Sequence, residues 1–208
     1  MLIYVVRHGQ SEGNINDTFT GITNVALTPK GIEQARLTAE YLSPVSFSAI
    51  YSSDLIRAVQ TAQPHAKMRN MEIAENKGLR EINAGEWEGK NYYSLFDLYP
   101  QTFKVWTENI GQGRPNGGES VTEVQKSVYD AMEEIATRHD GETVLVVTHA
   151  LALRTFIAKV KGETLDGKTD SGYVPNSSVT IVEYNKGKFT VKEEGYDAHL
   201  GDLTTKFP

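Results

Sequence analysis

Short apolar runs that alternate with amphipathic stretches constrain the fold of this chain more than any other feature of its sequence. The runs at residues 2–6 and 143–147 are rich in β-branched residues, and 49–52 is a third short run. Runs of this length are typical of buried strands, and the stretches that follow have the apolar spacing of helices. Strands that alternate with helices predict a three-layer α/β fold, with a mostly parallel central sheet and helices on both faces.

The first amphipathic stretch has clear boundary signals. Thr28 followed by Pro29 predicts a helix start, because proline in the first turn loses no hydrogen bond. Pro44 is expected to end this helix. Its buried face is predicted to consist of Ile32, Ala35, Ala39 and Leu42.

Two further helices are indicated by capping residues. Ser53 or Asp54 can cap a helix after the run at 49–52, which places Arg57 in its first turn. Ser120 with Glu123 forms a capping-box pattern at the start of a long apolar stripe. Both helices are predicted to pack on the central sheet.

The C-terminal half contributes a hairpin and an aromatic segment. Residues 178–184 and 188–193 alternate in polarity across Asn185-Lys186-Gly187, which predicts a hairpin at the sheet edge. The segment 90–118 is rich in aromatic residues, whose rings either pack among short helices or form an apolar wall beside a ligand. We expect one domain over 1–208, with 90–118 as a helical cap, because no stretch resembles a linker.

Composition excludes several functional classes. The 208 residues are 39% hydrophobic and 23% charged, as in an ordinary soluble globular protein. They include no cysteine, which rules out a disulfide scaffold, a thiolate zinc site and a cysteine nucleophile. The formal charge of -6 argues against a nucleic-acid or membrane partner. Without a signal peptide or a long apolar run, the chain is expected in the cytoplasm.

Two histidines directly follow two of the predicted strands. His8 comes after the run at 2–6, and His149 after the run at 143–147. A lone histidine is more often structural than catalytic, but the carboxyl ends of parallel strands form one crevice, so this pair is expected to share a cleft. Arg7 and Arg57 would make that cleft an anion site, since a guanidinium binds phosphate oxygens in a bidentate manner.

These residues lie within a series of motifs. Residues 6–14 read V-R-H-G-Q-S-E-G-N, and 21–31 read G-I-T-N-V-A-L-T-P-K-G. The later motifs are S-S-D-L-I-R-A at 52–58, L-R-E at 79–81, G-E-W-E-G at 85–89, G-E-S at 118–120 and V-V-T-H at 146–149. Together they span about residues 3 to 155, and they resemble the histidine phosphatase superfamily, which includes cofactor-dependent phosphoglycerate mutases. One departure is Ala150, where many members have glycine.

The resemblance implies a phosphohistidine mechanism. Neutral His8 would attack phosphorus with one ring nitrogen, while a backbone carbonyl holds the other. The phosphoryl oxygens would be held by Arg7, Arg57, His149 and Asn14. Neither a metal nor a cofactor is implied, and the histidines lack the spacing of a zinc site.

The resemblance also selects an acid and a substrate-binding set. Glu81 would protonate the leaving alkoxide and then activate water. On the residue pattern alone, Glu86 and Glu88 compete for this role, because all three lie in one predicted loop. Further substrate contacts are expected from Ser11, Gly21, Ile22, Thr23 and Ala150.

Within the superfamily that this chain resembles, the segment between Gly89 and Gly118 is the one that distinguishes phosphatases from mutases. The mutases resemble one another in a longer insert with adjacent arginines and a lysine that hold a second anionic group, whereas this segment has only Arg114 among arginines. We therefore expect a phosphatase acting on small phosphorylated metabolites. A 2,3-bisphosphoglycerate-dependent phosphoglycerate mutase and a non-catalytic phosphate-binding regulatory module stay open as alternatives, as does a homodimer.

Overall fold

A six-stranded sheet forms the centre of the computed structural model, which describes residues 1–165 and 173–205. The strand order is β3-β2-β4-β1-β5-β6, in which β1, β2, β3 and β4 run parallel and the last two strands are antiparallel to their neighbours. The strands are β1 Leu2–Arg7, β2 Ala49–Ser52, β3 Ile73–Glu75, β4 Thr143–Thr148, β5 Val179–Asn185 and β6 Lys188–Tyr196. The expected mostly parallel sheet with an edge hairpin is confirmed.

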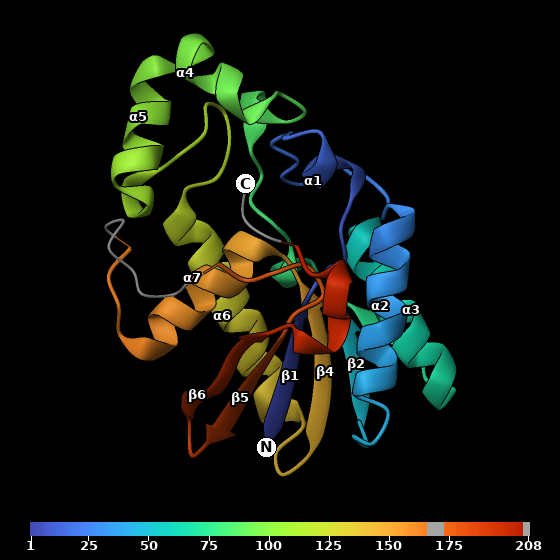
Figure 1. Cartoon of the computed structure of the whole chain (residues 1–208). Coiled ribbons are helices and arrows are strands. Elements are labelled where there is room, and N and C mark those ends of the chain that lie inside the picture. The colour runs from blue at the N-terminus through green and yellow to red at the C-terminus, as the bar shows by residue number, and fades with distance from the viewer. Residues whose placement is uncertain (166–172, 206–208) are drawn as a thin grey trace.

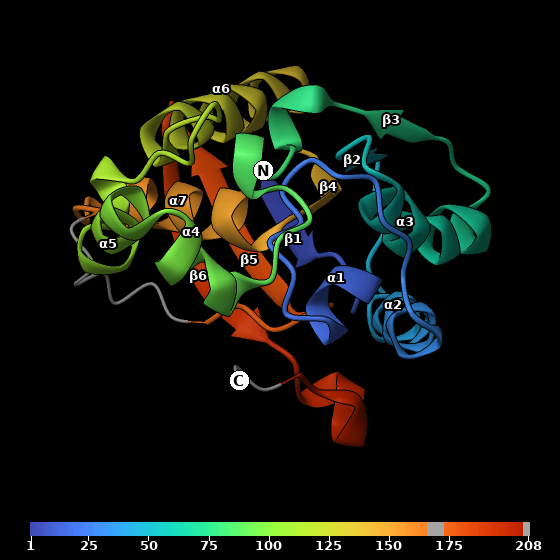
Figure 2. The ribbon, with the colours of Figure 1, turned by 90° about the horizontal axis from the view of Figure 1, so that it is seen from above.

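Helices cover both faces of this sheet, as Figures 1 and 2 show. Helices α2 and α3 lie on one face, and α6 and α7 on the other. The helices are α1 Glu12–Ile15, α2 Pro29–Tyr41, α3 Ile56–Arg69, α4 Leu95–Leu98, α5 Pro100–Glu108, α6 Val121–Arg138 and α7 Ala150–Lys161. Single 3-10 turns are η1 Lys77–Leu79, η2 Gly85–Trp87, η3 Tyr92–Ser94 and η4 Ile110–Gln112, and η5 spans Ala198–Leu203. The three-layer prediction is therefore confirmed.

The apolar runs of β1 and β4 are explained by burial on both faces. Val5 and Val146 belong to the core cluster under α6 and α7, whereas Val6 and Val147 belong to the cluster under α2 and α3. Successive residues of a strand point to opposite faces, so both faces need apolar side chains. This is why the runs show no polar alternation.

The predicted buried face of α2 is wrong at one position. Ile32 is 55% exposed, while Gln34 and Thr38 are buried. Gln34 accepts a hydrogen bond from the Gln10 N–H at 2.8 Å and donates one to the Leu203 carbonyl at 2.8 Å. A buried polar side chain is tolerated when its groups are paired, and those partners come from distant segments.

Two further local details differ from the sequence prediction. The N-cap of α3 is Leu55 rather than Ser53 or Asp54, and the Ile56 N–H is bound by the Asn24 side chain at 2.7 Å. Arg57 still lies in the first turn, as expected. The edge strand β3 was not predicted, because three residues show no usable period.

The aromatic segment forms short helices that lie beyond the carboxyl ends of β1 and β4 (Figure 1). Phe103 and Trp106 are buried, and both rings pack edge-on against Trp87. Tyr93 and Phe96 are instead 59% and 54% exposed. Phe103 and Trp106 therefore join the main core cluster, whereas other apolar side chains of the segment face solvent.

No helix within 1–165 and 173–205 combines the length and the apolar character needed to cross a membrane.

Candidate active site

Parallel pairing brings the two histidines together. Arg7 is the last residue of β1 and stands opposite Thr148, the last residue of β4, so His8 and His149 follow at the same edge. The His8 N–H donates to the Thr148 carbonyl at 2.9 Å. As a result the centroids of the two imidazole rings lie 5.1 Å apart. The prediction that both rings share one edge of the sheet is confirmed.

The protonation of His8 follows from its contacts. Its Nδ1 lies 2.7 Å from the Gly9 carbonyl oxygen, which accepts only, so Nδ1 carries the proton. Its Nε2 faces the Nε–H of Arg57 at 3.3 Å and keeps a lone pair. Burial, followed by the charges of Arg57 and Arg7, lowers the pKa of His8 well below 6.5. At neutral pH the ring is therefore uncharged, and Nε2 carries no proton.

Arg57 is held by the loop that follows α1. It donates to the Gly21 carbonyl at 2.7 Å and to the Thr23 carbonyl at 3.0 Å. The side chain is 1% exposed, and burial lowers its pKa to about 10, so the guanidinium stays charged at neutral pH. Gly21 and Thr23 thus orient an anion-binding group through their carbonyls, and their direct contact with a substrate stays a prediction.

Glu88 in turn holds this loop. Its carboxylate accepts from the backbone N–H groups of Ile22, Thr23 and Ala84, each at 2.9 Å, and from the Thr23 hydroxyl. Gly21 has a φ of 48°, and a Cβ there would meet the Glu88 carboxylate at 2.0 Å. The carboxylate is therefore occupied by structural hydrogen bonds, which removes Glu88 as a candidate for proton transfer.

Glu81 lies at the amino end of α7, which begins at Ala150. Its carboxylate accepts from the Leu151 N–H at 3.1 Å and from the Ile82 N–H at 3.0 Å. Its charge acts on both Arg57 and Arg7, which places it beside the guanidinium groups. Glu81 is half-buried, whereas Glu86 is exposed. The charge of Glu88 also acts on Arg57, whereas the charge of Glu81 acts on both Arg57 and Arg7.

Arg7 approaches the site from the end of β1. It is buried and donates to the Val174 carbonyl at 2.6 Å, and its guanidinium lies 5.7 Å from the centroid of the Tyr173 ring. Its Nε is buried and has no hydrogen-bond partner among the residues that the structure describes. A buried donor without a partner is costly, so this N–H is suited to a ligand oxygen.

Ser11 and Asn14 form the cap of α1 beside His8. The Asn14 side-chain oxygen accepts from the Ser11 N–H at 2.9 Å and lies 3.3 Å from the Asn176 amide nitrogen. Ser11 is buried and its hydroxyl also donates to Asn14. With its oxygen engaged, Asn14 has its amide N–H groups left to offer an anion.

Asn176 is a site residue that the sequence analysis missed. It is buried and donates to the His8 carbonyl at 3.0 Å, while the neighbouring Ser177 N–H donates to the Arg7 carbonyl at 3.0 Å. Both precede β5, which is antiparallel to β1, so the amino end of β5 meets the carboxyl end of β1. The Pro-Asn-Ser-Ser turn before the strand was a visible signal, but its position depends on the pairing direction.

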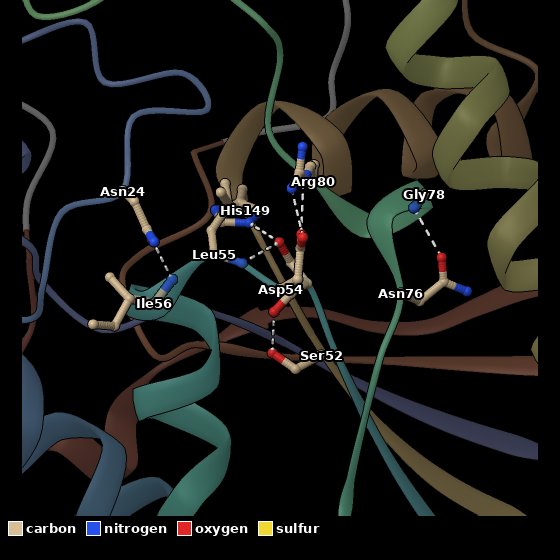
Figure 3. A network of polar contacts seen from close by, with 10 residues as sticks. Asn24, Ser52, Asp54, Leu55, Ile56, Asn76, Gly78, Arg80 and His149 are labelled. Atoms are coloured by element: carbon tan, nitrogen blue, oxygen red, sulfur yellow. Dashed lines mark hydrogen bonds and ion pairs between the residues drawn. The ribbon is translucent and has the colours of Figure 1, made fainter.

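Two hydroxyl groups were also missed. The Thr61 hydroxyl accepts from the Gly9 N–H at 2.9 Å. The Ser53 hydroxyl lies 2.8 Å from His149 Nε2, in the region shown in Figure 3. Both side chains are fully buried and fix the backbone or ring of a residue in the cleft.

His149 is enclosed more completely than His8. It is 0% exposed, and its Nδ1 has no hydrogen-bond partner among the described residues. Burial lowers the pKa of His149 well below 6.5, and Arg57 and His8 add to this effect. Arg80 also contributes, although its charge is paired with Asp54 at 2.5 Å (Figure 3). The ring is therefore neutral and carries a single proton.

Within the described ranges, no group of three or more histidine, cysteine, aspartate or glutamate side chains is arranged to hold a metal ion.

Comparisons with known proteins assign this chain to a family. The model of the histidine phosphatase superfamily (branch 1) matches residues 3–196. Phosphoserine phosphatase 1 of Hydrogenobacter thermophilus is 30% identical, over 97% of this chain and 95% of its own. Phosphoglycerate mutase-like protein 4 of Arabidopsis thaliana is 32% identical, over 95% of this chain and 86% of its own. The structure of Bacillus stearothermophilus YhfR is 35% identical with a TM-score of 0.91, covering 96% of this chain and 98% of that one. This chain is therefore a histidine phosphatase, a member of branch 1 of that superfamily.

Proposed function

We propose that this enzyme hydrolyses small phosphomonoesters and that His8 carries the phosphoryl group on Nε2. The observation that carries the proposal is the state of the His8 ring, whose proton is held on Nδ1 by the Gly9 carbonyl at 2.7 Å. A neutral imidazole with a lone pair on Nε2 is a competent nucleophile. Its lowered pKa keeps that lone pair available.

The phosphoryl group would lie among four donors, which come from Arg7, Arg57, His149 and Asn14. During transfer, negative charge spreads over the three equatorial oxygens, and fixed donors stabilise it without reorganisation. Arg7 offers its buried Nε–H and Asn14 its amide. Arg57 donates its Nε–H to His8 Nε2 in this structure, so this hydrogen bond would have to shift to a phosphoryl oxygen as Nε2 attacks phosphorus.

Glu81 would act first as an acid and then as a base. In the first step, Nε2 attacks phosphorus, the ester P–O bond breaks, and the leaving oxygen takes the proton of Glu81. In the second step, water gives a proton to the Glu81 carboxylate and attacks phosphorus, so the P–N bond breaks and neutral His8 is restored. Inorganic phosphate and an alcohol are the products, with no metal in either step.

The remaining predicted binding residues would line the entrance to the cleft that holds His8 and His149. We assign substrate contacts to the backbone of Gly21, Ile22 and Thr23 and to the half-buried Ala150, with Ser11 holding Asn14 in place. The chain would work as one cytoplasmic domain over 1–208, with the helical segment 90–118 capping the cleft.

Arg114 favours hydrolysis over mutase activity. It donates to the Gly118 carbonyl at 2.8 Å and to the Glu123 carboxylate at 2.8 Å, so its guanidinium is engaged at the start of α6. A mutase needs a second anion site that holds the substrate while the phosphoryl group returns. The only arginine between Gly89 and Gly118 is thus already paired.

The proposal is tested by assaying purified enzyme on a panel that includes p-nitrophenyl phosphate, phosphoserine and 3-phosphoglycerate with 2,3-bisphosphoglycerate. We expect release of inorganic phosphate, with kcat/KM ranking the substrates. Isomerisation of 3-phosphoglycerate with little phosphate release would show a mutase. Binding of phosphate without turnover of any compound would show a regulatory module.

The pH dependence should reflect the lowered pKa of His8. The ring must be unprotonated at attack, and its pKa lies well below 6.5, so acid should not remove the nucleophile near pH 6.5. We expect kcat/KM, corrected for the ionisation of the substrate, to show no loss of activity from protonation of His8 between pH 7 and about 5.5. An acidic limb centred near pH 6.5 would contradict a buried neutral His8.

A further inference from the structure

The contact between Ser53 and His149 has a definite direction. Ser53 lies in the loop between β2 and α3, is 0% exposed, and places its hydroxyl 2.8 Å from His149 Nε2. The Leu55 N–H donates to the same hydroxyl oxygen at 3.3 Å (Figure 3). One lone pair of the oxygen is therefore used, and the hydroxyl proton needs an acceptor.

His149 Nε2 is the acceptor that the described structure offers to this proton. A hydroxyl has one proton, and a buried donor is stabilised when it is paired. If Nε2 carried a proton instead, two donors would face each other, or the Ser53 proton would have to turn to another acceptor. Donation from Ser53 to Nε2 satisfies both groups.

This direction decides which nitrogen of His149 is protonated. The ring is neutral because burial and the nearby charge of Arg57 oppose a second proton. With Nε2 accepting, the single proton lies on Nδ1, which is buried and has no partner among the described residues. Nδ1 is thus a hydrogen-bond donor without an acceptor, in a ring 5.1 Å from that of His8.

We infer that Ser53 is a positioning residue that holds His149 in the Nδ1–H tautomer, so that Nδ1 donates to a phosphoryl oxygen. The role of the oxygen rests on the proposed function, whereas the tautomer does not. The Gly9 carbonyl selects the same tautomer in His8 by accepting from Nδ1. The two rings therefore carry their protons on the same atom but serve opposite purposes, a lone pair in one and a donor in the other.

The tautomer is measured directly by nitrogen NMR on enzyme labelled with ¹⁵N-histidine and free of ligand. The His149 signals are identified by their loss in His149→Asn. We expect the proton on Nδ1 in the wild type, and a mixture of tautomers or a proton on Nε2 in Ser53→Ala. The matched control is Ser52→Ala, which removes a neighbouring buried hydroxyl that donates to the Ser53 carbonyl and not to a ring. A proton on Nε2 in the wild type, or an unchanged tautomer in Ser53→Ala, would overturn the inference.

Kinetic measurements distinguish a positioning role of Ser53 from a purely structural role. Ser53→Ala should lower kcat by about 10- to 100-fold, as expected when the partner that orients a site histidine is lost, with a smaller change in KM. Ser52→Ala should retain a kcat close to that of the wild type. Equal kcat values for the two variants would refute the positioning role. If the tautomer is as expected but His8→Ala still releases phosphate, the proposed function fails while the assignment for Ser53 stands.

Discussion

Replacing His8 by alanine should lower kcat for every phosphomonoester by about 10⁴-fold or more, because no nucleophile would remain for the first step. Wild-type enzyme quenched during turnover should carry acid-labile phosphate, and the variant should carry none. Alanine keeps the backbone hydrogen bonds of His8 with Thr148 and Asn176, so circular dichroism should show an unchanged fold. Phosphate release and phosphoenzyme are measured on the same samples.

His139→Ala is the matched control for this substitution. His139 caps the C-terminus of α6 and contacts Tyr51 and Glu142, outside the cleft. Its loss should leave phosphoenzyme formation intact. Label that persists in His8→Ala would identify a different nucleophile and reject the mechanism.

Glu81→Gln should have an effect that depends on the leaving group. An alkoxide needs a proton as it departs, so turnover of alkyl phosphates should fall by about 10²- to 10⁴-fold. The p-nitrophenolate ion is stable without a proton, so phosphorylation by p-nitrophenyl phosphate should slow much less. Water activation would still be lost, so p-nitrophenol should appear in a burst that matches the enzyme concentration and phosphoenzyme should accumulate. Rapid-quench and stopped-flow measurements follow both products.

Glu86→Gln supplies the control within the same loop, because Glu86 is exposed and its carboxylate interacts with the Tyr99 hydroxyl in the aromatic segment. We expect wild-type kinetics with both substrate types. A burst in Glu86→Gln together with normal turnover in Glu81→Gln would transfer the acid and base role to Glu86. Equal losses for alkyl and nitrophenyl esters in the first step would show that Glu81 does not protonate the leaving group.

Much of the fold could be predicted because its signals are local. The β-branched runs of β1 and β4 show their burial through composition, and Thr28 with Pro29 marks the start of α2 through backbone chemistry. The prediction that Ile32 is buried was wrong because the buried face of α2 depends on a contact between distant parts of the chain. Gln34 is buried there because Leu203, far along the chain, accepts its hydrogen bond.

The sequence by itself determined the chemistry available at the cleft. His8 and His149 each follow an apolar run that forms a strand, and Arg57 lies in the first turn of a helix. Because ligand sites of open α/β sheets lie at the carboxyl ends of parallel strands, these side chains were expected at the same edge of the sheet. Each of these signals lies within a few consecutive residues, so it can be recognised in the sequence alone. The motifs that resemble the superfamily selected Glu81 in the same way.

Only the tertiary structure decided how each polar group is used. Glu88 is occupied because Ile22 and Thr23 fold onto it, and Asn176 reaches His8 because β5 runs antiparallel to β1. Hydrogen bonds between segments far apart in the chain leave no local period, since they depend on pairing direction and on which donors lack a partner. The nitrogen that carries the proton in each imidazole is therefore a property of the folded site.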